Sequence, residues 1–330
     1  MEVQVQQLPE WERLTRDPVA TALIGRDFLC LRDFSRTELE RMLELARLLK
    51  TWHKAGLHVR PLAGRTLAMI FQKPSTRTRV SFEVAMYQLG GHALFLSAQE
   101  LQLRRGETIE DTGRVLSRYV DAIMIRTYSH DDVVQLAAAA TVPVINGLTD
   151  YLHPAQALAD FLTIQERFGR LSGVQLTYVG DSNNVARSLA LGGARLGMRV
   201  VLSSPAGYQL DEQALAMARE DARASGGSVE VEADPRRAVA GADVVYTDVW
   251  ASMGQEADHD RRVQDLAAYQ VNRALLEQAA PHVVVMHCLP AHRGEEITDE
   301  VIDGPRSIVW DQAENRLHAQ KAILTLLLGA

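Results

Sequence analysis

Cysteine is scarce in this sequence, and its scarcity excludes several ways of stabilising a protein. Only Cys30 and Cys288 occur among the 330 residues. Two cysteines are too few for a disulfide framework or for a four-cysteine zinc site. We therefore expect no disulfide bonds, no metal centre and a location in the reducing cytoplasm.

Long apolar runs and an excess of positive charge are missing as well. Nowhere do about 18 apolar residues follow one another without a charge, as a membrane-spanning helix requires. The start of the chain lacks the apolar core behind positive charges that marks a secretory signal. The net charge of −7 argues against a nucleic-acid surface, because such a surface needs clustered lysine and arginine. We expect neither a membrane nor a nucleic acid as partner.

Length and patterning indicate an α/β protein with two domains. A chain of 330 residues exceeds the size at which one hydrophobic core usually stops growing. Apolar strand patterns alternate with helical patterns in both halves, which predicts parallel strands joined by helices. The expected strands are 66–71, 93–97, 121–127, 142–146, 174–180, 199–204, 229–233, 242–248, 283–287 and 307–310. The predicted fold is two lobes, each a mostly parallel sheet flanked by helices.

Two helices are expected to join the lobes. The sequence predicts a helix from His153 to about residue 169 that crosses between them, which gives a first domain at 1–150 and a second at 151–330. A last helix, at about 313–328, is expected to pack back on the first domain. Near the start, Ser35 and Glu38 form a capping-box pattern before a helix at 35–55.

The segment from Phe71 to Arg79 is the strongest candidate for an anion site. It joins a strand end to a helix start, where unpaired backbone N–H groups and the helix dipole favour negative charge. Two hydroxyl side chains follow one another at Ser75 and Thr76, and two guanidinium groups at Arg77 and Arg79 add donors suited to phosphate. The alternative is that Ser75 only caps the helix and the arginines are solvated.

A second polar pair begins the helix at His153. His153 and Gln156 are three residues apart and therefore project from one face of that helix. A neutral imidazole can donate to a carbonyl oxygen that gains negative charge, and the amide can accept from an NH₂ group. The plainer alternative is a histidine that caps or packs the helix.

Polar side chains also follow three strands of the second half. Asp248 and Ser252 follow one strand, and Cys288 follows another, so both groups belong to the edge of a parallel sheet where active-site loops lie. Asp248 could pair with a substrate ammonium group, whereas Cys288 could equally be an inert buried thiol. The turn from Gly180 to Asn184 lacks the G-x-G-x-x-G pattern, which disfavours an NAD-dependent dehydrogenase, and its amides suit a carboxylate better.

Taken together and in order, these motifs resemble the aspartate/ornithine carbamoyltransferase family. Ser75-Thr76-Arg77-Thr78-Arg79 is similar to the carbamoyl-phosphate signature of that family, and His153-Pro154-Ala155-Gln156 is similar to its second signature. His287-Cys288-Leu289-Pro290, with Asp248 and Ser252-Met253-Gly254, resembles the ornithine-specific branch. The resemblance extends from about residue 25 to the end. It implies transfer of a carbamoyl group from carbamoyl phosphate to L-ornithine, giving citrulline in arginine metabolism, without a cofactor.

The resemblance also implies the binding residues, with carbamoyl phosphate in the first domain and ornithine in the second. Carbamoyl phosphate would contact Ser75, Thr76, Arg77, Thr78, Gln102, Arg126, His153, Gln156, Cys288, Leu289 and Arg316. Ornithine would contact Asn184, Asp248, Ser252 and Met253. The residues implied in catalysis are Arg126, His153, Asp248 and Cys288.

Assembly is likewise expected only from the resemblance. The family forms trimers with active sites between subunits, and Gln102 matches the position that a neighbouring subunit contributes, so we expect a homotrimer or a multiple of trimers. The first 20 or so residues match no motif and could be an ordered extension, an assembly contact or a frayed tail. The alternatives to the function are a carbamoyltransferase for another amine and an inactive anion-binding homologue.

Overall fold

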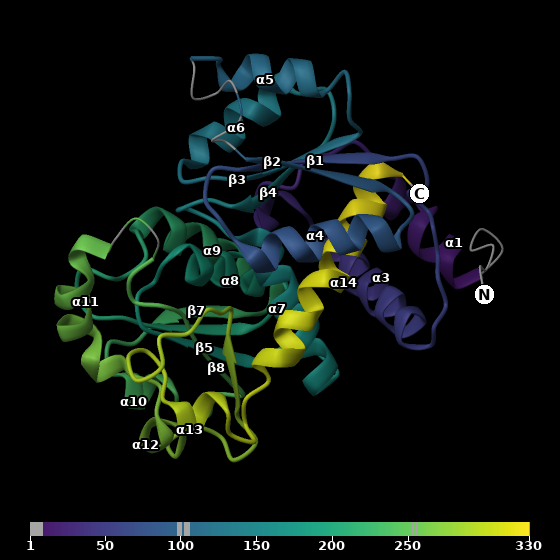
Figure 1. Ribbon diagram of the computed structural model, residues 1–330. Helices are drawn as coiled ribbons and strands as arrows, with labels where there is room; N and C mark the ends of the chain where they lie inside the picture. Colours follow the sequence, from purple (N-terminus) through teal and green to yellow (C-terminus); the bar gives the residue numbers. More distant parts are fainter. Residues whose placement is uncertain (1–8, 98–100, 102–105, 253, 255, 330) are drawn as a thin grey trace. The chain divides into compact units, whose positions relative to one another are not determined.

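The computed structural model describes residues 9–97, 101, 106–252, 254 and 256–329, and Figure 1 shows its elements. The chain divides into two compact units. Unit 1 comprises Met1–Leu162 with Arg316–Ala330, and unit 2 comprises Thr163–Asn315. Both divisions fall inside helices, α7 (Pro154–Phe168) and α14 (Val309–Leu328). Residues of both units therefore occur within each of these two helices, and unit 1 is discontinuous in sequence.

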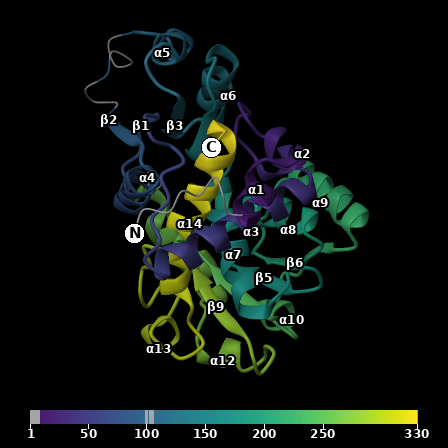
Figure 2. The same ribbon diagram turned by 90° about the vertical axis from the view of Figure 1, so that its right-hand side faces the viewer.

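Unit 1 is built on a four-stranded parallel sheet in the order β2-β1-β3-β4. The strands are β1 (Thr66–Phe71), β2 (His92–Ser97), β3 (Ala122–Arg126) and β4 (Val144–Leu148). Helices α5 (Ile109–Leu116) and α6 (His130–Ala139) cover one face, and α4 (Thr76–Gln88) lies on the other, as Figures 1 and 2 show. Each predicted strand of this half is present, and the parallel pairing is confirmed.

The helix expected at 35–55 is α3 (Arg36–Lys54), and its capping box is present. The Ser35 side chain accepts from the Glu38 N–H, and the Ser35 N–H donates to the Glu38 carboxylate at 2.7 Å. Eight apolar or aromatic side chains of this helix are buried, from Leu39 to Trp52. The amphipathic pattern in the sequence therefore marks the face of α3 that packs into unit 1.

Residues 9–21 form an ordered extension of unit 1. They contain the helices α1 (Pro9–Thr15) and α2 (Pro18–Thr21). Trp11 is buried and stacks on Trp52 of α3, with ring centroids 5.9 Å apart. Leu14 is buried as well, so α1 contributes to the core rather than fraying from it.

Replacing Trp11 by alanine is expected to lower the melting temperature by several degrees. The substitution removes a buried aromatic side chain and its stack on Trp52, a change that typically costs about 3 kcal/mol or more. Differential scanning calorimetry would measure the shift. The matched control is Trp310→Ala, because Trp310 is 62% exposed and its loss should leave the melting temperature nearly unchanged. Equal shifts for the two variants would contradict a core role for α1.

Unit 2 contains a five-stranded parallel sheet in the order β7-β6-β5-β8-β9. The strands are β5 (Gln175–Val179), β6 (Arg199–Ser203), β7 (Ser228–Val231), β8 (Val244–Thr247) and β9 (Val284–His287). Helices α8 (Asn184–Arg195) and α9 (Glu212–Ser225) lie on one face, and α12 (Arg273–Leu276) and α13 (Asp299–Ile302) on the other (Figures 1 and 2). The strands of this half are where the sequence predicts them, with one exception.

The prediction of a strand at 307–310 is wrong. Only Ser307 is bridged, to Val285, and α14 already begins at Val309 rather than at about 313. A short apolar run such as Ile308-Val309-Trp310 has no periodicity that separates a strand from the first turn of a helix. None of the described helices combines the length and the hydropathy that a membrane-spanning segment needs.

Candidate active site

The predicted anion site lies at the turn between β1 and α4 in unit 1. Ser75 caps α4, since its side chain accepts from the Thr78 N–H at 3.2 Å and also donates to the Thr78 hydroxyl oxygen at 3.2 Å. Thr78 is buried, whereas Thr76 is exposed and Arg77 half-buried. The first turn of α4 therefore combines a capped helix N-terminus with hydroxyl groups, which suits an anion.

Two arginines from distant parts of the sequence reach this turn. Arg126, at the end of β3, is buried, and its Nε donates to the Lys73 carbonyl oxygen at 3.2 Å. The Arg316 guanidinium donates to Thr78 Oγ1 and to Gln156 Oε1, both at 2.7 Å. The structure thus brings together, within unit 1, the turn between β1 and α4, the end of β3, the start of α7 and the unit-1 part of α14.

His153 is buried beside these cations, and its environment determines its protonation. Burial first, and then the positive charges of Arg316, Arg126 and Lys73, hold the pKa of His153 well below its ordinary value. The imidazole is therefore neutral near pH 7 and can donate one N–H group without carrying a charge. Gln156, one turn along α7, donates to the buried Asp160 at 2.8 Å, which fixes the orientation of its amide.

The depressed pKa of His153 predicts a pH dependence of stability. Unfolded His153 binds a proton near pH 6.5, but the folded residue does so only at lower pH, so the free energy of unfolding should fall as pH drops below about 6.5. The slope for one such group approaches about 1.4 kcal/mol per pH unit. His153→Gln should remove this contribution, which urea unfolding at pH 7.5, 6.5 and 5.5 would measure. Parallel curves for the two proteins would contradict the assignment.

Lys73 is a functional candidate for which the motifs in the sequence indicated no role. It is 3% exposed, its Nζ lies 2.9 Å from the Asp150 carboxylate, and it sits 4.9 Å from the centre of the Tyr128 ring. Lysine is seldom this deeply buried, because its charge is costly to remove from water. Its place two residues after the end of a buried strand was the available signal in the sequence.

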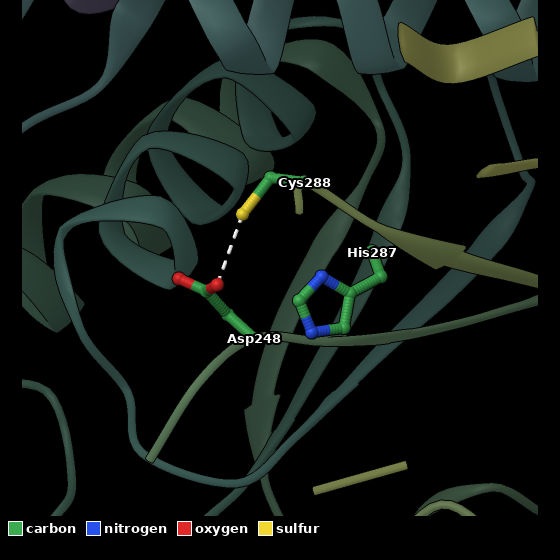
Figure 3. A group of neighbouring side chains, drawn as sticks. All are labelled: Asp248, His287 and Cys288. Atoms are coloured by element: carbon green, nitrogen blue, oxygen red, sulfur yellow. Dashed lines mark hydrogen bonds between the residues drawn. The ribbon is translucent and has the colours of Figure 1, made fainter. Parts of the chain in front are cut away.

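In unit 2, Asp248 and Cys288 meet at the carboxyl ends of the adjacent strands β8 and β9, as predicted (Figure 3). The Cys288 thiol donates to Asp248 Oδ1 at 3.0 Å. The second oxygen of Asp248 accepts from the Asn183 amide at 2.7 Å, and Asn183 also caps α8. Asn184, the predicted ligand, is buried as the first residue of α8. The residue that contacts Asp248 is its neighbour Asn183, and the sequence did not predict this contact.

This part of unit 2 is acidic and buried. Burial, together with the charge of Asp248 and then Asp181, raises the pKa of Tyr178 well above its ordinary value. Burial also raises the pKa of Asp181, although its ion pair with Arg262 at 2.7 Å acts in the opposite direction. Accumulated carboxylate groups of this kind suit a cationic group such as a substrate ammonium.

The turn after Cys288 has an unusual backbone. Leu289 is a non-glycine residue with φ of 60°, and the Leu289–Pro290 peptide bond is cis. The Leu289 N–H donates to His287 Nδ1 at 2.8 Å, and His287 Nε2 lies 3.1 Å from Glu296 Oε1. Both partners of that last pair are fully buried. His287 and Glu296 therefore hold the Cys288–Leu289 turn in place, a role that the sequence did not indicate.

The same contacts bear on metal binding. Donor atoms of Asp248, His287 and Cys288 lie within 4.8 Å of one another. His287 Nδ1 accepts from the Leu289 N–H, and its Nε2 faces Glu296 in a fully buried pair, so this histidine could bind an ion only by breaking the contacts that hold the turn. Of the remaining predicted residues, Ser252 is half-buried after β8, whereas Gln102 and Met253 lie outside the described residues.

These features define the class of protein: a two-unit α/β enzyme with polar residues buried at strand ends and helix starts. Two family models cover nearly all of the chain. The aspartate/ornithine carbamoyltransferase carbamoyl-P binding domain matches residues 26–166, and the Asp/Orn binding domain of the same family matches residues 172–327. The chain belongs to the aspartate/ornithine carbamoyltransferase family, and the resemblance inferred from its motifs is confirmed.

Similar proteins agree with this assignment. The chain is 61% identical over 311 residues to the anabolic ornithine carbamoyltransferase of Pyrococcus furiosus, covering 94% of this chain and 99% of that relative. It is 61% identical to the ornithine carbamoyltransferase of Symbiobacterium thermophilum, covering 94% of this chain and all of that relative. The solved structure of the P. furiosus enzyme matches with a TM-score of 0.91 and 61% identity, over 93% of this chain and 98% of that one.

Proposed function

We propose that this protein is an ornithine carbamoyltransferase, which converts carbamoyl phosphate and L-ornithine into L-citrulline and phosphate. The relatives described above carry that name. The observation that carries the proposal is the buried cationic cluster of Lys73, Arg126 and Arg316 beside Thr78 and His153. This cluster, part of which falls within the match to the carbamoyl-P binding domain, has the charge and the donors that carbamoyl phosphate requires.

Unit 1 would supply the groups for carbamoyl phosphate. The N-terminus of α4, with Ser75, Thr76, Arg77 and Thr78, would bind the phosphate, and Arg126 and Arg316 would add charge-assisted hydrogen bonds. His153 would donate to the carbonyl oxygen and Gln156 would accept from the NH₂ group. The depressed pKa of His153 supports this role, because a neutral donor near three cations adds no further repulsion.

Unit 2 would supply the groups for ornithine. Asp248 with Ser252 would take the α-ammonium group, and Asn184 with the Met253 backbone would take the α-carboxylate. Cys288 and the Leu289 carbonyl would lie beside the side-chain amine. The hydrogen bond from Cys288 to Asp248 supports a role for the thiol in orienting and desolvating that amine rather than in attacking the substrate.

The chemistry needs no covalent intermediate. The neutral amine attacks the carbonyl carbon, the C–O bond to phosphate breaks, and the nitrogen loses a proton as phosphate leaves. Negative charge grows on the carbonyl oxygen and then on phosphate, where donors that are already in position lower the barrier. An ordinary alkyl ammonium has a pKa near about 10.4, so the site must also select or create the neutral amine.

A ureido-product assay tests the proposal. Carbamoyl phosphate would be supplied with ornithine, aspartate, putrescine or acetylornithine at equal concentration. We expect product with ornithine alone. Product with another amine would support the residues assigned to carbamoyl phosphate but overturn the roles of Asp248 and Ser252. Absence of product with every amine would indicate an inactive anion-binding homologue.

We also propose a homotrimer, or a multiple of trimers, with active sites shared between subunits. Exposed apolar side chains on neighbouring elements of unit 1 support a protein contact there: Val80 and Tyr87 on α4 and Leu94 on β2 are 49%, 80% and 39% exposed. Sedimentation equilibrium would give the mass. Mixing Gln102→Ala with Arg126→Gln subunits should restore part of the activity if Gln102 serves a neighbouring subunit. The cytoplasmic location stays a prediction.

A further inference from the structure

Unit 2 carries a second group of side chains that can bind metals, separate from Asp248 and Cys288. His259, the first residue of α11 (His259–Leu266), has its Nδ1 3.3 Å from the carboxylate of the exposed Asp260 and its Nε2 3.2 Å from both carboxylate oxygens of Glu295. Its Nε2 therefore faces a group that could bind the same ion. Nδ1 of His292 is 3.5 Å from the same carboxylate. All three donor atoms lie within 4.8 Å of one another, so one ion could contact all three.

We propose that His259, His292 and Glu295 bind a divalent transition-metal ion, with Zn²⁺ as the probe. Two imidazoles and one carboxylate are donors that zinc and its neighbours in the first transition row prefer. The three side chains are 38%, 43% and 28% exposed, which leaves room for water at the remaining coordination positions. Glu295 also supplies negative charge next to the ion.

The backbone around two of the ligands is already ordered. The His292 N–H donates to the buried Glu296 carboxylate at 2.6 Å, and the Glu295 N–H donates to the His292 carbonyl oxygen at 3.0 Å. The Gly294 N–H donates to the Ile297 carbonyl oxygen at 2.9 Å. A turn held in this way loses little conformational entropy when it binds an ion, and this favours affinity.

Such an ion would connect two segments of unit 2. His259 follows the segment that contains Ser252, whereas His292 and Glu295 follow the Cys288–Leu289 turn. The ion would therefore link both segments to which we assign ornithine contacts, and occupancy is expected to change the KM for ornithine. This consequence rests on the proposed function, whereas metal binding itself does not.

Binding is tested by isothermal titration of the full-length protein with ZnCl₂. A Cys288→Ser background removes the other strong zinc donor. We expect one ion per chain, with affinity at least about tenfold weaker after His259→Ala or Glu295→Gln. The matched control is His282→Ala, because His282 forms a comparable surface pair with Asp243 at 2.6 Å, and the described residues place no third ligand beside that pair.

The outcomes separate the alternatives. Absence of binding, or equal affinity in the His259→Ala protein, would overturn the site. Zinc binding to the wild-type chain that disappears with Cys288→Ser would instead assign the ion to Asp248 and Cys288, and would also overturn it. In the ureido assay, zinc should change the ornithine KM of wild type but not of His259→Ala. An unchanged KM despite bound zinc would refute this expected effect, and absence of product would refute only the proposed function.

Discussion

Arg126→Gln is expected to lower kcat/KM for carbamoyl phosphate by about 10²- to 10³-fold, the usual cost of losing one well-placed donor to developing negative charge. Arg126 is buried at the end of β3, with its Nε fixed by the Lys73 carbonyl. Arg126→Lys keeps the charge but not the planar fork of donors, so its activity should be intermediate. Steady-state kinetics with carbamoyl phosphate varied at saturating ornithine would measure both effects.

A second measurement distinguishes this electrostatic role from general damage. The charge of Arg126 is one of the causes that lower the pKa of His153, so Arg126→Gln should raise that pKa, which NMR titration of the histidine would detect. The control is Arg36→Gln, which removes the same charge from an exposed pair with Glu40 in α3. Wild-type kinetics in Arg126→Gln, or an unmoved His153 pKa, would remove Arg126 from the site.

Asp248→Asn is expected to lower kcat/KM for ornithine by about 10²-fold or more. One partner of a buried charge pair with the substrate ammonium would be lost, and such losses typically cost about 2 kcal/mol or more. In the wild type, Asn183 and Cys288 each donate to one of the two carboxylate oxygens of Asp248. An asparagine replaces one of these oxygens with an NH₂ group, which cannot accept a hydrogen bond. Kinetics with ornithine varied at saturating carbamoyl phosphate would show the loss.

Phosphate binding serves as the internal check on Asp248. Calorimetric titration with inorganic phosphate should give the same affinity in Asp248→Asn as in wild type, because the cationic cluster belongs to unit 1. Glu277→Gln is the matched control, since it removes one negative charge from an exposed pair with Arg273. If Asp248→Asn kept an unchanged KM for ornithine, the carboxylate would have no part in binding this substrate.

Most of the strands were predictable because they are short apolar runs bounded by turn residues. The run from Thr66 to Phe71 and the run from Gln175 to Val179 are both central strands in which nearly every residue is buried. Capping chemistry is equally local, and therefore Ser35 and Glu38 marked the start of α3 correctly. The strand predicted around Ile308 was wrong, because the local pattern does not distinguish a strand from an isolated bridge followed by a helix.

Contacts between distant residues could not be read from residue order. Arg316 and Thr78 are 238 positions apart, yet their side chains are 2.7 Å apart, and only the resemblance to a family suggested a common role for them. The contact between Glu296 and His287 could not be predicted either, because no sequence motif indicates it. Which side chains share a buried pocket depends on how the sheets are covered by helices, and composition and spacing carry little information about that.

The discontinuity of unit 1 has a consequence for how the protein is made. The ribosome synthesises residues 1–162, then the whole of unit 2, and only then Arg316–Ala330. Until that last segment emerges, the nascent unit 1 lacks the guanidinium that contacts Thr78 and the Leu327 carbonyl that accepts from the Gly25 N–H. The cationic cluster is therefore completed after translation of the second unit, and a chain that terminates early would lack Arg316 even with every strand of both sheets in place.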